Sequence, residues 1–461
     1  MFQNKGFVGL YGAVVSKKSF VAVILTLVLV VIYNLNGRDS DSVDAVPATL
    51  LPVSLLTDRD TRLNEFQTLF QPQPKLLQAA VVFGAVQKKD GDLISSYPLG
   101  GALLATPFYA VAQFFGVLDY HDWMSYRLTA KLTASIMVAV SAAVLFLVLI
   151  QLMPLPGALW LSLAYGLGTG AFSIASQAMW QHAPGMLCLS LVLLGILNLD
   201  RRAIGGTWVA FATGLALALA VICRNLNIFA AIAFTLYMLV YQRRLLLPYL
   251  LPLACFAAWL LHYNYTHFSN FTGGYDAILN SQWHRSRNLL ETGMFNHPLG
   301  QGLLDTWLSP SKGVLIYTPF IAFAFAPLVL KVTQHRRLMI ICYIWLVLAA
   351  IVIAKNTLWW GGTSFGPRYF LELLIVMIFL IGLIYQKLPV TGRYTLNGLI
   401  MISMMIHTLG VFYAPCGWAD KPTWADFHPD RYRDWSDTEI ERCLARGLQE
   451  GPLPPIFFVE N

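Results

Sequence analysis

The chain has 461 residues, of which 57% are hydrophobic and only 12% charged, and its formal net charge is +7. Soluble domains carry about 25% charged residues, so this composition excludes a soluble globular protein and indicates a polytopic membrane protein. The chain has no P-loop and no dinucleotide-binding fingerprint, and its basic residues sit where they encode membrane topology. Neither a nucleotide nor a nucleic acid is therefore an expected partner.

Apolar runs long enough for a membrane-spanning helix recur along nearly the whole chain, and the alternating pattern of β-barrel strands is absent. We therefore expect an all-α protein. The first run, at residues 20–35, follows Lys17 and Lys18. Because no small-residue cleavage site follows it, we expect an uncleaved signal anchor and not a removed signal peptide.

Five groups of basic residues lie between the apolar runs and predict which connections face the cytoplasm. They are Lys17/Lys18, Arg201/Arg202, Arg243/Arg244, Arg336/Arg337 and Lys387/Arg393. Eleven crossings place all of these groups on the cytoplasmic side. The predicted crossings are residues 20–35, 132–150, 158–178, 184–198, 206–222, 228–241, 245–262, 314–331, 338–354, 370–385 and 395–413.

This count requires that residues 98–118 do not cross the membrane, because a further span there would move the next three basic pairs outside. Pro98, Gly100, Gly101 and Pro107 suit an interfacial or re-entrant helix better than a straight span. An alternative with twelve spans and a different short helix elsewhere stays open.

The same count collects the polar segments on the outer face. We expect a transmembrane domain of residues 1–413, with outer loops at 36–130, 263–312 and 355–369, juxtamembrane helices in the first of these loops, and a small outer cap at residues 414–461. Polar segments gathered on one face indicate an outward-facing active site.

The first outer loop begins with an acidic segment that contains Asp39, Asp41 and Asp44. A carboxylate at the membrane border, partly shielded from water, can serve as a general base for an acceptor hydroxyl. Asp44 is the first candidate because an apolar, proline-containing helix signal follows it, and Asp41 is the second. A solvated acidic turn is the alternative interpretation.

Residues 359–369, Trp-Trp-Gly-Gly-Thr-Ser-Phe-Gly-Pro-Arg-Tyr, form a glycine-rich loop between two apolar runs. Glycines allow a sharp turn close to a ligand, Trp360 and Tyr369 offer flat faces, and Arg368 can bind a phosphate through two N–H groups. Arg224 and Lys355 are further candidates for binding the donor phosphate. Both can instead extend toward the interface from helix ends.

His182, in Trp180-Gln181-His182 at the outer end of a span, can bind a substrate, ligate a metal or cap an aromatic belt. Tyr275 lies in an outer loop where aromatic rings stand beside amide and hydroxyl groups, which favours contact with a sugar. No second His or carboxylate at ligand spacing accompanies His182. No obligatory cofactor is therefore expected, and a divalent metal stays open.

Two of the six cysteines, Cys416 and Cys443, lie in the polar tail, and an exported tail makes a disulfide between them plausible. Their spacing alone does not establish the bond. The other four are expected to be packing residues in or beside apolar runs: Cys188, Cys223, Cys255 and Cys342.

The order of several short motifs resembles a bacterial branch of the GT-C superfamily of integral-membrane glycosyltransferases, which includes aminoarabinose transferases and protein O-mannosyltransferases. The motifs are Asp44 with Pro47, Asp90-Gly91-Asp92 leading to Ser96-Tyr97-Pro98, Trp180-Gln181-His182, Ser309-Pro310-Ser311-Lys312-Gly313 and Trp360 to Tyr369. The resemblance covers most of the chain, and Asp44 falls where such families place their catalytic base. Tyr97, in the second of these motifs, is a further candidate for binding the substrate.

This resemblance implies an inverting transferase that moves a sugar from a polyprenyl monophosphate to an acceptor hydroxyl outside the bacterial cytoplasmic membrane. Glycans, lipids and proteins are the acceptors used across the superfamily. The chain departs from the aminoarabinose-transferase pattern at two places: Ser96 and Tyr97 precede Pro98 where that pattern has a lysine, and His182 stands near where it has an aspartate. Donor contacts and acid–base details are therefore expected to differ.

Two other functions stay open. A lipid-linked-sugar flippase or other transporter should show polar residues at mid-membrane depth and internal repeats, and neither is clear in this sequence. An enzyme resembling an O-antigen ligase should instead prefer a polyprenyl pyrophosphate donor.

Overall fold

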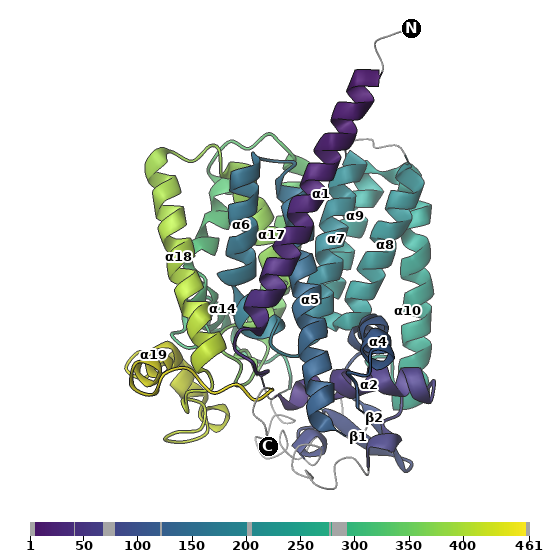
Figure 1. Ribbon diagram of the computed structural model, residues 1–461, viewed down its shortest axis with the longest axis vertical. Coiled ribbons are helices and arrows are strands. Elements are labelled where there is room, and N and C mark those ends of the chain that lie inside the picture. Colours follow the sequence, from purple (N-terminus) through teal and green to yellow (C-terminus); the bar gives the residue numbers. More distant parts are fainter. Residues whose placement is uncertain are drawn as a thin grey trace.

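The computed structural model describes residues 5–40, 42–67, 79–119, 122–200, 205–275, 278 and 293–457. They form a bundle of apolar helices, with a small hairpin and several short helices gathered at one end (Figure 1). The long helices are α1 (Lys5–Asn34), α5 (Trp123–Leu149), α7 (His182–Asp200), α8 (Gly206–Cys223), α10 (Leu246–Phe268), α16 (Arg336–Lys355) and α18 (Val390–Tyr413). Shorter ones are α2 (Val46–Thr57), α4 (Gly100–Phe114), α6 (Leu155–Leu167), α9 (Ile228–Tyr241), α14 (Leu299–Leu308), α15 (Val314–Tyr317), α17 (Leu373–Ile384) and α19 (Glu439–Glu450).

Seven helices in the described part of the chain are long and apolar enough to cross a membrane: α1, α5, α7, α8, α10, α16 and α18. The other predicted crossings coincide with shorter apolar helices, namely α6, α9, α17 and the 3-10 helix η6 (Pro319–Leu328). Every predicted crossing therefore contains a helix, and the prediction of an all-α polytopic membrane protein is confirmed. All residues of α17 are buried, so this helix lies at the centre of the bundle.

Two predicted crossings are not the single straight helices that their length suggests. In 158–178, α6 ends at Leu167 and a π-helix, η3 (Ala171–Ala175), follows. A Cβ on Gly170 would lie 2.5 Å from Leu371 Cδ2, so the break lets the chain pack closely against the start of α17. In 314–331, α15 ends at Tyr317 because Pro319, which lacks an N–H, starts a new helix.

The predicted basic connections meet at one end of the bundle. The Arg337 guanidinium lies 4.8 Å from the centre of the Tyr241 ring, and Lys387 Nζ donates to the carbonyl of Lys331 at 3.1 Å. These contacts join the end of α9, the start of α16 and the connection from α17 to α18. Arg201 and Arg202 lie outside the described residues.

The opposite end carries α2, α4, α19 and the hairpin of β1 (Val86–Lys89) and β2 (Asp92–Ser95) (Figure 1). Asp90 and Gly91 have φ values of 53° and 93°, the left-handed geometry of a tight hairpin turn. Helix α4 has 15 residues and contains Pro107. It packs on α8 so closely that a Cβ on Gly100 would lie 2.5 Å from the Ile222 carbonyl. Residues 98–118 thus contain one short helix, and its interfacial or re-entrant placement stays a prediction.

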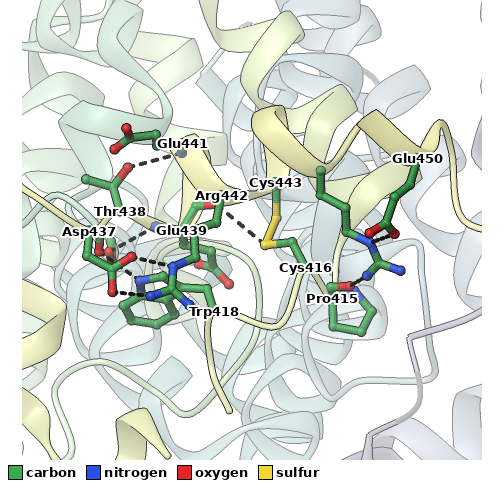
Figure 2. The surroundings of a disulfide bond; sticks show 12 residues. Pro415, Cys416, Trp418, Asp437, Thr438, Glu439, Glu441, Arg442, Cys443 and Glu450 are labelled. Carbon is green, nitrogen blue, oxygen red and sulfur yellow. Dashed lines mark hydrogen bonds and ion pairs between the residues drawn. A yellow bond between two sulfur atoms is a disulfide. The ribbon is translucent and has the colours of Figure 1, made fainter. Parts of the chain in front are cut away.

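The tail runs from the end of α18 to Phe457 and packs against the polar end of the bundle. A disulfide joins Cys416 to Cys443 of α19, as the sequence suggested (Figure 2). Thr438 accepts a hydrogen bond from the backbone N–H of Glu441 and caps α19. Three free cysteines are buried as expected, Cys188, Cys223 and Cys342, but Cys255 is exposed on α10. Its expected packing role is therefore wrong, because little of the α10 surface contacts the rest of the bundle.

Candidate functional site

Asp44 lies in a short turn, η1 (Val43–Ala45), immediately before α2. Its Oδ1 accepts a hydrogen bond from the Tyr97 hydroxyl at 2.7 Å, and its Oδ2 accepts one from Arg368 Nη1, also at 2.7 Å. The carboxylate keeps 28% of its side-chain exposure. The structure therefore joins the candidate base to the candidate phosphate-binding residue, which lies 324 positions away in the sequence.

The acidic segment is not a solvated turn. Asp39 receives two hydrogen bonds from Arg127, at 3.0 and 2.5 Å, and both side chains are largely buried. This pair anchors the segment to α5 and helps to hold Asp44 in place. Asp41, the second candidate base, lies outside the described residues.

Arg368 is enclosed by aromatic rings at the end of the glycine-rich loop. Its guanidinium carbon lies 5.2 Å from the centre of the Trp180 ring and 5.8 Å from that of Tyr369. Its Nε is buried and, in the described part of the chain, has no hydrogen-bond partner. Burial opposes the charge on Arg368, but the nearby Asp44 outweighs it and raises the pKa, so the side chain stays positive. An enclosed cation with an unused donor is suited to an anionic ligand.

The loop glycines are required by this geometry. Gly361 has a φ of 69°, in the left-handed region that favours glycine. A Cβ at that position would lie 3.1 Å from both Cγ and Nε of Arg368. Any larger residue at 361 would therefore push against the arginine side chain.

Glu372 organises a second, more deeply buried group of charges. Its Oε2 lies 2.5 Å from Arg224 Nη1, and its Oε1 lies 3.0 Å from His182 Nδ1. Arg224 also lies 5.5 Å from the centre of the Tyr369 ring. Tyr369 is thus flanked by both candidate arginines. Arg224 is paired and buried and does not extend to the interface as the alternative interpretation held.

Sequence reasoning missed Glu372. The available signal was a carboxylate at the start of an apolar run, three residues after Tyr369. Such a residue is costly in a membrane unless it is paired, so it indicates a partner.

Tyr97 and Tyr275 lie on the same side of the site. Their rings meet edge to face with centres 6.2 Å apart, and the Tyr275 hydroxyl donates to Gln181 Oε1 at 3.2 Å. Burial, with the charge of Asp44 adding to it, raises the pKa of the Tyr97 hydroxyl, so it remains a hydrogen-bond donor. Burial likewise raises the pKa of Tyr275 to about 12.

Two predicted site residues lie apart from this group. Trp360 stacks on Tyr432 of the tail with ring centres 5.3 Å apart, and its Nε1 donates to Asp426 at 2.7 Å. Trp360 is connected to the site only through a small pocket, which it lines together with Arg368 and Tyr369. Lys355 ends α16, where its backbone carbonyl accepts from His297. No contact between its side chain and Arg368 is found among the described residues.

The described residues offer no evident group of ligands for a metal ion. In the described part of the chain, no three His, Cys, Asp or Glu side chains are grouped to hold one. His182 is committed to Glu372 through Nδ1.

Replacing Glu372 with alanine should destabilise the protein strongly, because Arg224 would remain as a buried, unpaired charge. Loss of one partner of a buried ion pair costs about 3–5 kcal/mol. Thermal unfolding of the detergent-solubilised variant measures this loss. The double variant Arg224→Met/Glu372→Leu, which removes both charges, should regain much of it. A Glu372→Ala protein as stable as the wild type would show that the pair contributes little.

Comparisons with known proteins show similarity only in three dimensions. No protein-family model matches the chain, and no curated protein sequence matches it. The apo oligosaccharyltransferase of Archaeoglobus fulgidus superposes with a TM-score of 0.50 and 10% identity, covering 90% of this chain and 60% of that one. The chain has the GT-C fold. ArnT from Cupriavidus metallidurans, an aminoarabinose transferase bound to undecaprenyl phosphate in its crystal structure, has a TM-score of 0.49 and 14% identity over 96% of this chain and 70% of its own.

The expected resemblance to GT-C proteins is therefore confirmed for the fold. The chain spans 60% of the length of the oligosaccharyltransferase. Within this GT-C fold, the paired Asp44 and Arg368 lie at the polar end of the bundle, beside the start of α2.

Proposed function

We propose that the protein is a membrane glycosyltransferase that moves a sugar from a polyprenyl monophosphate to an acceptor hydroxyl with inversion at the anomeric carbon. The observation that carries the proposal is the contact between Asp44 and Arg368 at the polar end of a GT-C fold. The fold similarity to an oligosaccharyltransferase supports the same class of reaction.

Arg368 would bind the donor phosphate. The guanidinium uses Nη1 for Asp44 and leaves Nε without a partner in the described chain, so it retains donor capacity for phosphate oxygens. The anionic phosphodiester of the donor would also compete with Asp44 for the cation. Donor binding would then weaken the Asp44–Arg368 ion pair and free the carboxylate to act.

Asp44 would then serve as the general base. It takes the proton from the acceptor hydroxyl while the acceptor oxygen bonds to the anomeric carbon and the bond from that carbon to the phosphate oxygen breaks. Polyprenyl phosphate leaves with its charge stabilised by Arg368. Attack opposite the phosphate inverts the anomeric carbon. The Tyr97 hydroxyl, 2.7 Å from Asp44, would orient the carboxylate.

The proposed location is the outer face of the bacterial cytoplasmic membrane. The basic residues Arg337 and Lys387 gather at the end of the bundle opposite Asp44, and positive residues favour the cytoplasmic side. The site would thus open to the outside, where glycan, lipid or protein acceptors are available.

The donor class is tested by native mass spectrometry of the detergent-purified protein with a panel of polyprenyl monophosphate sugars and polyprenyl pyrophosphate oligosaccharides. Selective retention of a monophosphate sugar is expected, followed by transfer to an added acceptor. Retention of pyrophosphate oligosaccharides alone would replace the proposal with a ligase, and retention of neither class would favour transport.

A further inference from the structure

Residues 364–366 of the glycine-rich loop are held by two segments that are distant in sequence. The carbonyl of Ser364 accepts a hydrogen bond from Lys312 Nζ. The backbone N–H of Gly366 lies within hydrogen-bonding reach of the Glu439 carboxylate on α19. Lys312 and Glu439 in turn form an ion pair at 3.5 Å. The segment that leads to Arg368 is therefore tied to the C-terminal tail by charged side chains.

This ion pair is buried. The side chain of Lys312 is 1% exposed and that of Glu439 is 6% exposed. The Tyr317 hydroxyl also donates to Glu439, at 3.0 Å, so both Lys312 and Tyr317 bind the carboxylate. A buried ion pair is weak evidence for stability, because apolar residues of similar size are often at least as stable. Its geometry here suggests a second role, since Lys312 also donates to the loop backbone at Ser364.

The backbone between these two contacts has little freedom to move. The Phe365 ring meets the Tyr317 ring edge to face at 5.2 Å and lies against α18, where a Cβ on Gly410 would come within 2.3 Å of it. Gly366 has a φ of 88°, and a Cβ there would lie 2.7 Å from the Tyr317 ring. Side chains and backbone bonds thus fix the same three residues.

A disulfide and several hydrogen bonds hold the part of the tail that carries Glu439 (Figure 2). The disulfide between Cys416 and Cys443 holds α19 one turn beyond Glu439. Directly before α19, the carbonyl of Asp437 accepts from Trp418 Nε1 at 2.8 Å, and its carboxylate accepts from Arg442 Nη2 at 2.7 Å. The carboxylate of Glu439 is therefore carried by a rigid element.

We propose that Glu439 and Lys312 are positioning residues for Arg368, a role that rests on the proposed function. They fix Ser364 and Gly366 so that Arg368, two residues further on, stands over Trp180 and against Asp44. The C-terminal tail therefore helps to position a residue of the donor site, in addition to packing over the bundle.

The test uses the full-length protein in detergent with Glu439→Gln, Lys312→Met and the double variant Lys312→Met/Glu439→Gln. Glu441→Gln, on the same helix but exposed, is the matched control. Three quantities are measured: thermal unfolding, hydrogen–deuterium exchange of peptides covering residues 361–370 in the absence of donor, and steady-state kinetics with the monophosphate donor.

We expect the double variant to unfold near the wild-type temperature, because no charge is left unpaired. Its loop peptides should nevertheless exchange faster, and its donor KM should rise roughly tenfold to hundredfold with a smaller change in kcat, as for a misplaced binding group. Glu441→Gln should match the wild type in all three measurements.

A double variant with wild-type stability, loop exchange and donor KM would overturn the positioning role. Exchange is measured without donor, so it remains informative if no lipid-linked sugar is a substrate. Faster loop exchange in a protein that binds no donor would retain the link from tail to loop but contradict the proposed function. Unchanged exchange in an active enzyme would contradict the positioning role alone.

Discussion

Replacing Asp44 with asparagine is expected to lower the rate of sugar transfer by roughly 10²- to 10⁴-fold, the usual contribution of a general base. The amide keeps the size of the carboxylate, but only its carbonyl oxygen accepts, so it can retain one of the two hydrogen bonds from Tyr97 and Arg368. It cannot take the acceptor proton. Donor binding should be preserved, because the negative charge that competes with the donor phosphate for Arg368 is gone.

The measurement is kcat with a saturating donor, combined with donor retention by native mass spectrometry. Asp58→Asn is the matched control, since Asp58 is an exposed carboxylate directly after α2, the helix that Asp44 precedes. It should leave both quantities unchanged. Near-normal turnover by the Asp44→Asn enzyme would show that the base is elsewhere.

Replacing Arg368 with alanine is expected to weaken donor binding itself. Hydrogen bonds to charged groups contribute about 1.5–3 kcal/mol, which corresponds to a rise in donor Kd of roughly tenfold to 150-fold. The change also removes the positive partner of Asp44, so kcat should fall as the leaving phosphate loses its stabilising charge.

The variant Arg368→Lys distinguishes the contribution of the positive charge to donor binding from that of the planar guanidinium group. Lysine keeps the positive charge but lacks the planar fork of N–H donors, so donor Kd should recover only in part. Arg393→Ala, an exposed arginine in α18 at the opposite end of the bundle, is the control and should bind the donor normally. If Arg368→Ala retained wild-type donor affinity, the phosphate would have to be bound by another group.

Much of the fold could be predicted because the features that drive membrane insertion lie within short stretches of the sequence. A run of apolar residues must form a helix in the hydrocarbon, since its backbone polar groups have no other partners there. For residues 98–118, the prolines, the glycines and the side preference of basic residues predict a helix that does not cross. The break after Leu167 was missed, because it accompanies a close approach of Gly170 to Leu371, which lies just before the distant helix α17.

The sequence named Asp44 and Arg368 as candidate site residues but did not predict the ion pair between them. Asp44 and Arg368 each carried a local signal, a carboxylate before a helix and an arginine in a glycine-rich loop. The placement of Trp360 against the tail was not predicted, since its partner Tyr432 lies outside the loop.

The sequence by itself determined the membrane class, the helical segments and the end of the bundle where polar chemistry gathers, because hydropathy and charge act over short stretches of chain. Only the tertiary structure decided which charges meet: Asp44 with Arg368, Glu372 with Arg224 and Glu439 with Lys312. These partners are 324, 148 and 127 residues apart. Their contacts follow from the packing of whole helices, and a local pattern cannot encode them.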